Sequence, residues 1–478
     1  MTTPTYARLF GTDGIRGRAG EFPLDPATIT AIGRALGELL DGSIIIGRDP
    51  RESSPWIFEP LREGVESGRT TVLDAGILPT PAIALLTGRS GAAGGVMISA
   101  SHNSFEDNGI KVFGANGQKL DDRDEARVEE RVWELLAAPR PSGSSRAASG
   151  RGGPSPDYAA EYMAILRAGF PQGRWLTGFR IGVDCANGAT SQVAPRLFES
   201  LGATVHAIHA NPDGRNINAG CGAVHPDSLV EWVRKNPVDL GVAYDGDGDR
   251  SMFVTGSGRL IDGDGVLLVM ARALRKQGRL NPPVVVGTSM TNFALEQILS
   301  REGIRVLRVD VGDRFVFRKM LDEGVRLGGE PSGHVIFPDF RLSGDGLLTT
   351  LKLCETMIAG DASLEELTRD WVPAPQILLN VPVAERIPLD SLPEVTFKIK
   401  YISDLLKDRG RIVVRYSGTE PLLRIMIESD SAQTNEALAG ELAEAVRRAM
   451  PPDPDASRPP GAAPTAADGS PEFRGSGS

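Results

Sequence analysis

Short apolar runs alternate along most of this chain with stretches of helical periodicity. The apolar runs predict buried strands at 44–46, 71–73, 96–98, 181–183 and 284–286. The periodic stretches predict helices at 27–40, 55–67, 189–201, 265–277 and 292–302. Because buried strands that alternate with helices are typical of parallel, doubly wound sheets, the pattern predicts an α/β fold.

The length of the chain requires several domains. It has 478 residues, whereas one hydrophobic core stops growing at roughly 250–300 residues. Residues 140–156 are rich in Pro, Ser, Gly and Ala, which predicts a flexible linker, and a proline-containing stretch near 371–376 marks a second boundary. We expect three related doubly wound α/β domains, a small C-terminal α+β domain and a disordered tail, at 1–150, 157–255, 256–370, 374–450 and 451–478. Residues 469–478 resemble vector-encoded sequence.

Composition and charge are those of an ordinary globular protein. Hydrophobic residues make up 41% of the chain and charged residues 24%. The formal net charge of −10 disfavours binding to nucleic acid or to a membrane surface. Cys185, Cys221 and Cys354 match neither a disulfide framework nor a zinc pattern. No run resembles a signal peptide or a membrane span, so we expect a reducing, cytoplasmic location.

The most informative stretch is 245–250, in which aspartate and glycine alternate. An apolar run at 240–243 precedes it, so we expect the loop at the end of a buried strand, where α/β sheets bind ligands. Asp245, Asp247 and Asp249 can then turn their carboxylates toward one point, where they repel one another unless a cation lies between them. All-oxygen ligation favours a hard ion, and Mg²⁺ is the first candidate. A solvated acidic turn is the alternative interpretation.

Two further stretches carry candidate polar chemistry. Ser101 follows the predicted strand at 96–98 and could be a nucleophile or a phosphate carrier, although a structural turn is the alternative. Glu330, Ser332 and His334 are spaced by two, so in an extended chain they would point the same way and could bind adjacent sugar hydroxyls. A polar face on an edge strand would show the same spacing.

The stretch 415–421, followed by Arg424, suits an anion. Ser417, Gly418 and Thr419 offer hydroxyl and backbone N–H donors in a turn, and Arg415 and Arg424 can add bidentate pairing. The alternative interpretation is a capped loop between two strands.

In this order, the four stretches resemble the motifs of the α-D-phosphohexomutase superfamily, over roughly residues 6–450. The resemblance implies three related α/β domains and a fourth, mobile α+β domain around a central cleft. Segments 9–17, 183–190, 216–222 and 311–314 are most similar to the phosphoglucosamine mutase branch. Two positions depart from that branch: Pro331 stands where glutamine is typical, and Ser104 where proline commonly follows Ser-His-Asn.

The resemblance implies a phosphoserine mechanism. Ser101 would carry a phosphoryl group and donate it to the 1-hydroxyl of a 6-phosphosugar, and the bisphosphorylated sugar would turn over and return its other phosphate. A glucosamine 1,6-bisphosphate-type species would therefore also act as an activator. One Mg²⁺ would be held by an oxygen of phosphorylated Ser101 together with Asp245, Asp247 and Asp249.

The same resemblance assigns roles to basic and polar residues. Arg16 and Arg250 are candidates for contacting the transferring phosphoryl group. His102 is a candidate for orienting Ser101, and a structural hydrogen bond is the alternative for this residue. Lys111 matches the general acid/base of the family, and nearby cations would depress its pKa toward roughly 7–8. Glu330, Ser332 and His334 would hold sugar hydroxyls, while the 415–421 turn and Arg424 would hold the phosphate that is not reacting. His206, His209 and His225 match none of these sites.

The implied activity is an intramolecular phosphotransferase that interconverts glucosamine 6-phosphate and glucosamine 1-phosphate, upstream of UDP-N-acetylglucosamine. A phosphomannomutase/phosphoglucomutase acting on hydroxy-sugar phosphates is the alternative. A regulatory sugar-phosphate-binding protein without catalysis and a metal-dependent phosphatase are further alternatives. We expect hexosamine or hexose phosphates as the ligands, neither nucleic acid nor membrane as a partner, and a monomer or homodimer.

Overall fold

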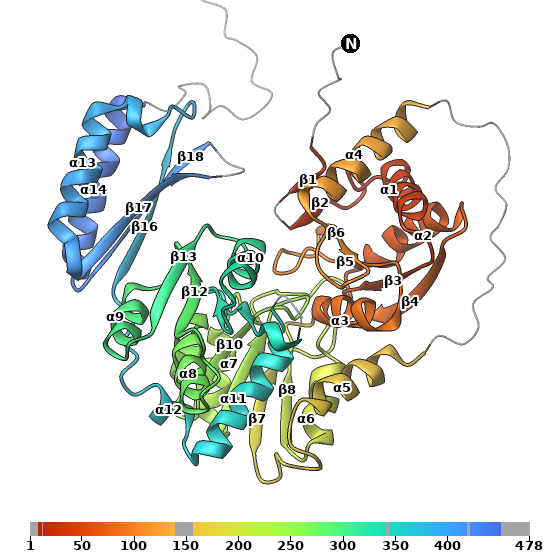
Figure 1. The fold of residues 1–478 in the computed structure, drawn as a ribbon, viewed down its shortest axis with the longest axis horizontal. Helices are drawn as coiled ribbons and strands as arrows, with labels where there is room; N and C mark the ends of the chain where they lie inside the picture. Colours follow the sequence, from red (N-terminus) through yellow and green to blue (C-terminus); the bar gives the residue numbers. More distant parts are fainter. Residues whose placement is uncertain (1–7, 12, 139–155, 341–343, 418–420, 451–478) are drawn as a thin grey trace, which may run out of the picture. The chain divides into compact units, whose positions relative to one another are not determined.

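The computed structural model describes residues 8–11, 13–138, 156–340, 344–417 and 421–450 (Figure 1). The chain divides into two units, Met1–Val372 and Pro373–Ser478. Within the described residues, the first unit contains three mixed sheets and the second contains one antiparallel sheet. The predicted tail at 451–478, and all but the last residue of the predicted linker at 140–156, lie outside the described residues.

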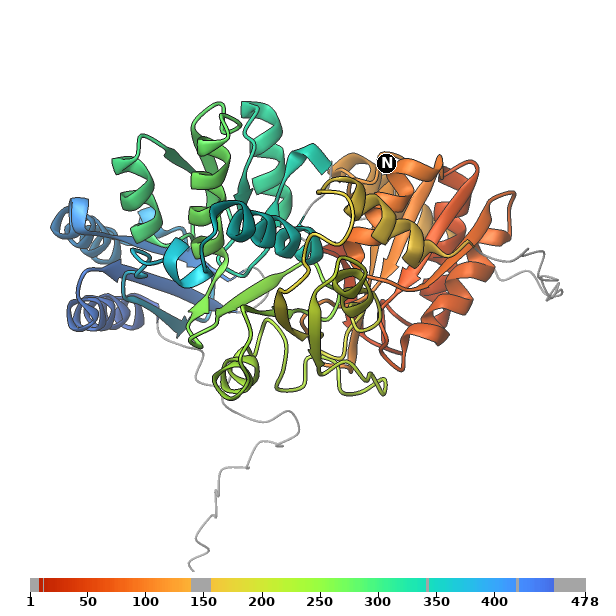
Figure 2. The same cartoon turned by 90° about the horizontal axis from the view of Figure 1, so that it is seen from below.

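The first sheet, in the order β1-β2-β6-β5-β3-β4, lies between helices on both of its faces (Figures 1 and 2). Its strands are β1 (Phe10–Gly11), β2 (Gly14–Arg18), β3 (Ser43–Arg48), β4 (Thr71–Ile77), β5 (Gly94–Ile98) and β6 (Asp107–Gly114). Its helices are α1 (Pro26–Leu39), α2 (Ser54–Glu66), α3 (Thr80–Ser90) and α4 (Asp122–Ala137). Ile44 and Ile46 of β3 belong to the core formed with α1, α2 and α4. On the opposite face α3 lies so close that a Cβ at Gly47 would meet Ile83 at 2.3 Å.

The second sheet has the order β11-β10-β9-β7-β8 and the third has the order β13-β12-β14-β15. The strands are β7 (Arg180–Asp184), β8 (Thr204–Ile208), β9 (Leu240–Tyr244), β10 (Ser251–Thr255), β11 (Leu260–Ile261), β12 (Val284–Thr288), β13 (Arg305–Val309), β14 (Gly328–Gly329) and β15 (Val335–Ile336). The accompanying helices are α5 (Tyr158–Ala168), α6 (Val193–Ser200), α7 (Asp227–Lys235), α8 (Gly263–Lys276), α9 (Phe293–Arg301), α10 (Asp313–Glu323), α11 (Gly346–Gly360) and α12 (Leu364–Leu367).

The predicted α/β class is confirmed, and each of the first three sheets combines the expected parallel pairs with antiparallel ones. Parallel pairs β3–β5, β7–β9 and β12–β14 are each followed by an antiparallel pair, β5–β6, β9–β10 and β14–β15. The physical reason is the length of the connection, because a short loop can join only antiparallel neighbours. These three returning loops, at 99–106, 245–250 and 330–334, contain the first three motifs of the sequence.

The second unit is the predicted α+β fold. Its sheet has the order β16-β18-β17, from β16 (Gln376–Pro382), β17 (Gly410–Tyr416) and β18 (Leu422–Ser429). Helices α13 (Pro393–Leu406) and α14 (Ala432–Ala449) supply side chains to its core, which includes Val381, Ile425 and Leu442.

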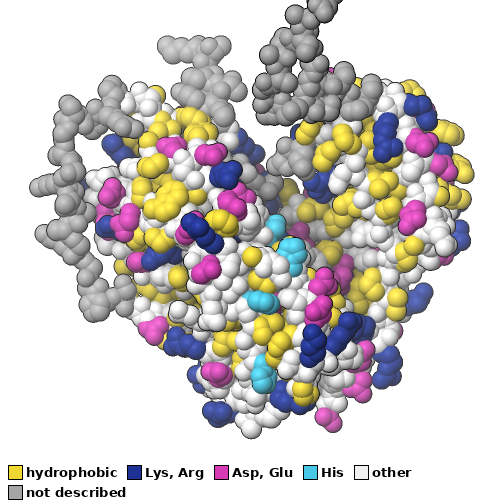
Figure 3. Space-filling model, turned by 180° about the vertical axis from the view of Figure 1, so that it is seen from behind, with side chains coloured by type: hydrophobic (Ala, Val, Ile, Leu, Met, Phe, Trp, Pro, Cys, Tyr) yellow, Lys and Arg dark blue, Asp and Glu magenta, His cyan; other side chains and the backbone are white. Residues whose placement is uncertain are grey.

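The surface carries charge of both signs. On the face drawn in Figure 3, acidic and basic side chains are interspersed rather than gathered into one basic patch. Among the described residues, no helix combines the length and the apolar character that a bilayer span requires.

Candidate active site

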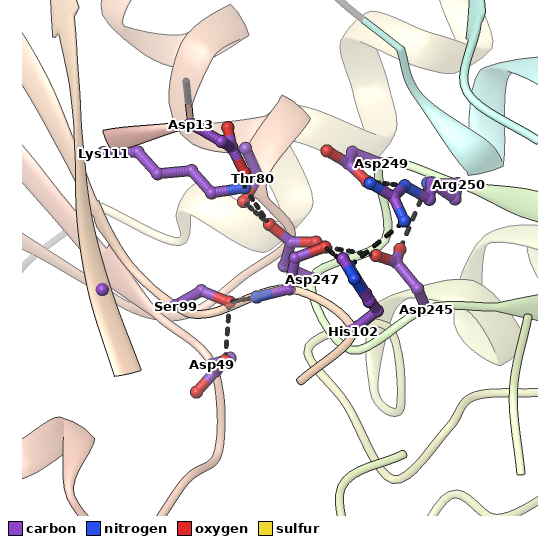
Figure 4. A network of polar contacts seen from close by, with 12 residues as sticks. Asp13, Asp49, Thr80, Ser99, His102, Lys111, Asp245, Asp247, Asp249 and Arg250 are labelled. Atoms are coloured by element: carbon purple, nitrogen blue, oxygen red, sulfur yellow. Dashed lines mark hydrogen bonds and ion pairs between the residues drawn. The ribbon is translucent and has the colours of Figure 1, made fainter. Parts of the chain in front are cut away.

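The loop after β5, with Ser99 and His102, lies beside Asp245, Asp247 and Asp249 of the loop after β9 (Figure 4). Ser101 follows β5 and Asp245 follows β9. Ser101 Oγ donates a hydrogen bond of 2.6 Å to Asp245 Oδ2, and both residues are buried. Ser101 has a φ of 54°, a left-handed conformation that few residues with a Cβ adopt. The fold therefore imposes the position of this hydroxyl.

The three aspartates form a compact, buried group of oxygen donors. Carboxylate oxygens of Asp245, Asp247 and Asp249 lie within 4.8 Å of one another. Burial raises the pKa of Asp245 well above its ordinary value, and the charges of Asp249 and Asp247 add to that effect. Asp247 Oδ1 and Asp249 Oδ1 have no hydrogen-bond partner among the described residues, although both are buried. The donor set therefore fits a hard divalent cation.

Lys111 of β6 contacts this loop directly. Its Nζ lies 2.8 Å from Asp247 Oδ2 and 3.0 Å from Asp13 Oδ2. Burial opposes its charge, but Asp13 and Asp247 outweigh burial and raise the pKa of Lys111 above its ordinary value. The neighbouring arginines therefore do not depress this pKa toward neutrality, because two carboxylates contact the amine, and the depression expected from bound Mg²⁺ stays a prediction.

Arg250 and His102 form a second polar pair beside Ser101. Arg250 Nη1 lies 3.1 Å from His102 Nδ1, and the same ring nitrogen lies 3.5 Å from Ser101 Oγ. Burial lowers the pKa of His102 to about 4, and the charges of Arg250 and Arg16 contribute. The ring is therefore neutral at physiological pH, and Nδ1 can accept a hydrogen bond from the guanidinium.

The loop that carries Ser101 is held by a buried ion pair that the sequence analysis did not select. Arg51 Nε contacts Asp49 Oδ2 at 2.8 Å, and both side chains are completely buried. Arg51 Nη2 donates to the backbone oxygens of Ser101 and Asn103, both at 3.0 Å. Ser99 Oγ donates to Asp49 Oδ2 and accepts from the Ser101 backbone N–H. The signal available in the sequence was an acidic and a basic residue two positions apart, Asp49 and Arg51, shortly after a predicted strand.

Asp13 was also missed as a site residue. It lies in the 9–17 segment and contacts Lys111, Lys119 and Arg16. Lys119 continues the chain of charges to Asp313 Oδ2 at 2.7 Å. Asp13 therefore bridges Arg16 and Lys111. A cavity of about 380 Å³ opens here and is lined partly by Lys111, Lys119 and Asp313.

The sugar-loop motif has a different conformation from the one expected. Residues 330–334 form a turn between β14 and β15, in which the Gly333 N–H donates to the Glu330 backbone oxygen at 3.0 Å. The prediction of an extended segment, with all three side chains pointing the same way, is therefore wrong. Ser332 is exposed, whereas His334 is buried and its Nε2 accepts from the Gly344 N–H at 2.7 Å. Glu330 Oε1 accepts from the Gly312 N–H at 3.0 Å.

The proposed phosphate turn belongs to the second unit. Gly418 and Thr419 lie outside the described residues. Arg415 of β17 stands directly opposite Arg424 of β18, and the Ser417 N–H donates to the Leu422 oxygen at 2.9 Å. Directly opposed positions share one face of a sheet, so the two arginines lie on the same face.

Comparisons with known proteins agree with this architecture. Models of the phosphoglucomutase/phosphomannomutase family match residues 7–138 with alpha/beta/alpha domain I, 160–258 with domain II, 262–374 with domain III and 378–445 with the C-terminal domain. A phosphoglucosamine mutase of Koribacter versatilis is 43% identical over 94% of this chain and 100% of its own length. The phosphoglucosamine mutase of Solibacter usitatus is also 43% identical, over 92% of this chain and 99% of its own.

Solved structures show the same fold at lower identity. A phosphoglucomutase/phosphomannomutase family protein from Burkholderia thailandensis superposes with a TM-score of 0.75 at 23% identity, over 93% of this chain and 98% of its own. An N-acetylphosphoglucosamine mutase from Aspergillus fumigatus gives a TM-score of 0.60 at 19% identity, over 94% and 97%. The chain therefore belongs to the α-D-phosphohexomutase superfamily, and within it to the branch of the phosphoglucosamine mutases.

Proposed function

We propose that this protein is a phosphoglucosamine mutase that interconverts glucosamine 6-phosphate and glucosamine 1-phosphate through phosphorylated Ser101. The observation that carries the proposal is the hydrogen bond from Ser101 Oγ to Asp245 in a buried, acidic strand-end loop. Two phosphoglucosamine mutases, each 43% identical to this chain over 94% and 92% of its length, support the proposal.

Mg²⁺ is the cation that we assign to Asp245, Asp247 and Asp249, and when bound it would draw negative charge from the transferring phosphoryl group. The Aspergillus enzyme was solved with GlcNAc-6P and magnesium, which supports a hexosamine phosphate and this ion here. Arg250 would contact a phosphoryl oxygen, with its guanidinium oriented by the neutral His102 ring. Arg16, anchored by Asp13, would add a second positive charge.

Phosphoryl transfer requires one proton to move in the opposite direction to the phosphoryl group. The bond from phosphorus to Ser101 Oγ breaks, the bond to the sugar oxygen forms, Oγ gains a proton and the sugar hydroxyl loses one. We assign to Lys111, which is charged in this structure, the transfer of a proton to Oγ and the recovery of one from the sugar hydroxyl. We assign Glu330, Ser332 and His334 to the sugar, and the 415–421 turn with Arg424 to the distal phosphate.

A two-substrate assay tests the proposal. The purified enzyme should convert glucosamine 6-phosphate with a kcat/KM at least about 10-fold above that for glucose 6-phosphate or mannose 6-phosphate, a difference of roughly 1.4 kcal/mol. A preference for a hydroxy sugar would instead favour a phosphomannomutase/phosphoglucomutase. Pro331 in the sugar loop could contribute to such a preference. Release of inorganic phosphate without isomer formation would contradict both mutase assignments.

A further inference from the structure

A second group of metal-type ligands lies outside the aspartate loop, in the sheet that contains β7 and β8. Asp184 is the last residue of β7, His209 directly follows β8, and Cys221 lies in the long connection from β8 to α7. No sequence motif links these residues, since they are separated by 25 and 12 positions (184 to 209, and 209 to 221). The fold alone brings them together.

One ligand atom from each residue lies within 4.8 Å of the other two. Asp184 and Cys221 are completely buried, while the His209 side chain is 36% exposed. His209 Nδ1 is buried and lies 3.1 Å from Asp184 Oδ2. The ring nitrogen and the carboxylate oxygen are therefore close enough to bind the same ion.

The backbone around the group is held in an unusual conformation. Ala186, Asn187 and His209 have φ values of 53°, 46° and 45°, in the left-handed region that residues with a Cβ rarely adopt. The Asn187 N–H donates to the His209 oxygen at 2.6 Å, and the Gly222 N–H donates to Asp184 Oδ2 at 3.0 Å. Strain of this kind is maintained where the surroundings require a given side-chain position, so it marks the group as a candidate site.

We propose that Asp184, His209 and Cys221 bind a borderline-soft divalent metal ion, Zn²⁺ in the first instance, at a site separate from the aspartate loop. Imidazole nitrogen, thiolate sulfur and carboxylate oxygen together are typical ligands of Zn²⁺, whereas Mg²⁺ prefers oxygen alone. Binding replaces the proton on Cys221 Sγ with the metal and releases that proton to the solvent. The exposed side of His209 leaves the fourth position of a tetrahedral ion to water or to an added ligand.

The site would brace the loop that carries Ser101. Asn218 precedes Cys221 by three positions, and its Nδ2 donates to the backbone oxygens of Ser101 at 2.9 Å and Asn103 at 3.0 Å. The Asn218 N–H in turn donates to the Ala186 oxygen at 2.9 Å, two residues after Asp184. A metal that joins Asp184 to Cys221 would therefore stiffen the connection between the second sheet and the Ser101 loop.

Cobalt binding tests the proposal. Co²⁺ takes the place of Zn²⁺ and gives a thiolate-to-metal charge-transfer band when cysteine is a ligand, while excess Mg²⁺ keeps the aspartate loop occupied. Reduced wild-type protein should bind one Co²⁺ with this band, and so should Cys354→Ser, which removes a buried cysteine elsewhere in the chain. Cys221→Ser should abolish the band. A wild type without the band, or a Cys221→Ser protein that keeps it, would overturn the proposal.

Two further variants separate the site from folding and from catalysis. Asparagine tolerates a left-handed backbone, so His209→Asn should fold and should raise the Kd for Co²⁺ at least about 10- to 100-fold, the range found when even a group that only orients a ligand is changed. An unchanged Kd in His209→Asn would contradict the site even if Cys221→Ser failed to fold. Ser101→Ala should keep the band, because its three proposed metal ligands are unchanged. The cobalt result is therefore independent of the mutase activity.

Discussion

Asp247 is the residue at which the acidic loop meets the candidate proton donor. Its Oδ2 accepts hydrogen bonds from Lys111 at 2.8 Å and from Thr80 at 2.5 Å. Its Oδ1 is buried and has no hydrogen-bond partner among the described residues. One oxygen is thus engaged by the protein, while the other remains available to a cation.

Asp247→Asn should weaken Mg²⁺ binding and lower turnover, because the loop loses one of its three negative charges. We expect the Kd for Mg²⁺ to rise at least about 10-fold and kcat to fall with it. Calorimetric titration of Mg²⁺ and turnover at increasing Mg²⁺ measure both. Asp322→Asn, at an exposed acidic position, is the control. Full wild-type activity in excess chelator would rule out the metal assignment.

Ser101→Ala should abolish turnover while the protein remains folded, because only the hydroxyl that accepts the phosphoryl group is removed. The expected fall in kcat is at least about 10³-fold, since loss of a covalent nucleophile removes a whole reaction path. Ser104→Ala, in the same loop, should retain activity. Intact-mass spectrometry of the wild type should show a partial addition of one phosphoryl group at Ser101. Substantial turnover by pure Ser101→Ala would reject the phosphoserine mechanism.

At the scale of elements, the same strand–loop–strand unit occurs in each of the first three sheets. A parallel strand reaches the carboxyl edge, a short loop reverses the chain, and an antiparallel strand returns. The buried Arg51 secures the first of these loops by donating to its backbone oxygens. The first loop therefore presents the proposed phosphate carrier, Ser101, on a backbone that Arg51 holds in place.

Arg51→Met should destabilise the protein strongly, because the change leaves the buried Asp49 carboxylate without its cation. Breaking a buried pair in this way costs about 3–5 kcal/mol. Arg34→Met, which removes a surface pair with Glu38, should cost about 0–1 kcal/mol. Urea unfolding of the three proteins gives these differences. Equal losses for the two variants would show that Arg51 does not anchor the loop.

Asp345 gives the stability a predictable dependence on pH. It caps α11 and accepts from Tyr162 of α5 at 2.9 Å, and burial raises its pKa to about 6. The folded protein therefore holds this proton to a higher pH than the unfolded chain does. Between about pH 4 and pH 6 this group makes the free energy of unfolding fall as pH rises, by up to about 3 kcal/mol.

Asp345→Asn keeps the hydrogen-bond acceptor but cannot ionise. The variant should therefore gain stability relative to the wild type as pH rises from 4.5 to 7, which urea unfolding at several pH values measures. Asp345→Ala, which also removes the helix cap, should lose about 1 kcal/mol relative to asparagine. A difference between Asp345→Asn and the wild type that does not change with pH would contradict the raised pKa.

At the scale of the whole molecule, the proposed mutase needs a second anchor for the phosphate that is not reacting. The second unit carries Arg415 and Arg424 at directly opposed positions of β17 and β18. Such an anchor would let either end of the sugar present itself for reaction while the distal phosphate stays bound.

Arg424→Ala should weaken substrate binding without affecting the chemistry at Ser101. A charge-assisted phosphate contact contributes roughly 1.5–3 kcal/mol, so kcat/KM should fall about 10- to 150-fold, mainly through KM. Phosphorylation of Ser101 and Mg²⁺ binding should persist, and compaction by ligand in small-angle scattering should diminish. Arg448→Ala, at an exposed position of α14, is the matched control. An unchanged kcat/KM would favour the alternative interpretation, in which 415–421 is a capped loop between two strands and binds no phosphate.

Sequence alone determined the class of fold and the positions of the main motifs. Five predicted strands and their helices exist because apolar periodicity reflects local geometry, which each segment carries by itself. The predicted helix at 189–201 begins only at Val193, since the residues before it form a turn with left-handed backbone at Ala186 and Asn187. Strand β16 and helix α13 were not predicted, because half-exposed segments lack a clear apolar pattern.

Only the tertiary structure decided which residues from distant segments meet. The hydrogen bonds from Arg51 to the backbone oxygens of Ser101 and Asn103, and the contacts of Asp13 with two lysines, depend on strand order rather than on local sequence. The direction in which the pKa of Lys111 shifts also depends on which charges surround the amine, and two carboxylates contact it directly. Asp184, His209 and Cys221 share no motif, yet the strand order of the second sheet brings their ligand atoms together. Spacing along a chain encodes local direction, whereas proximity across a fold arises only when the sheets are assembled.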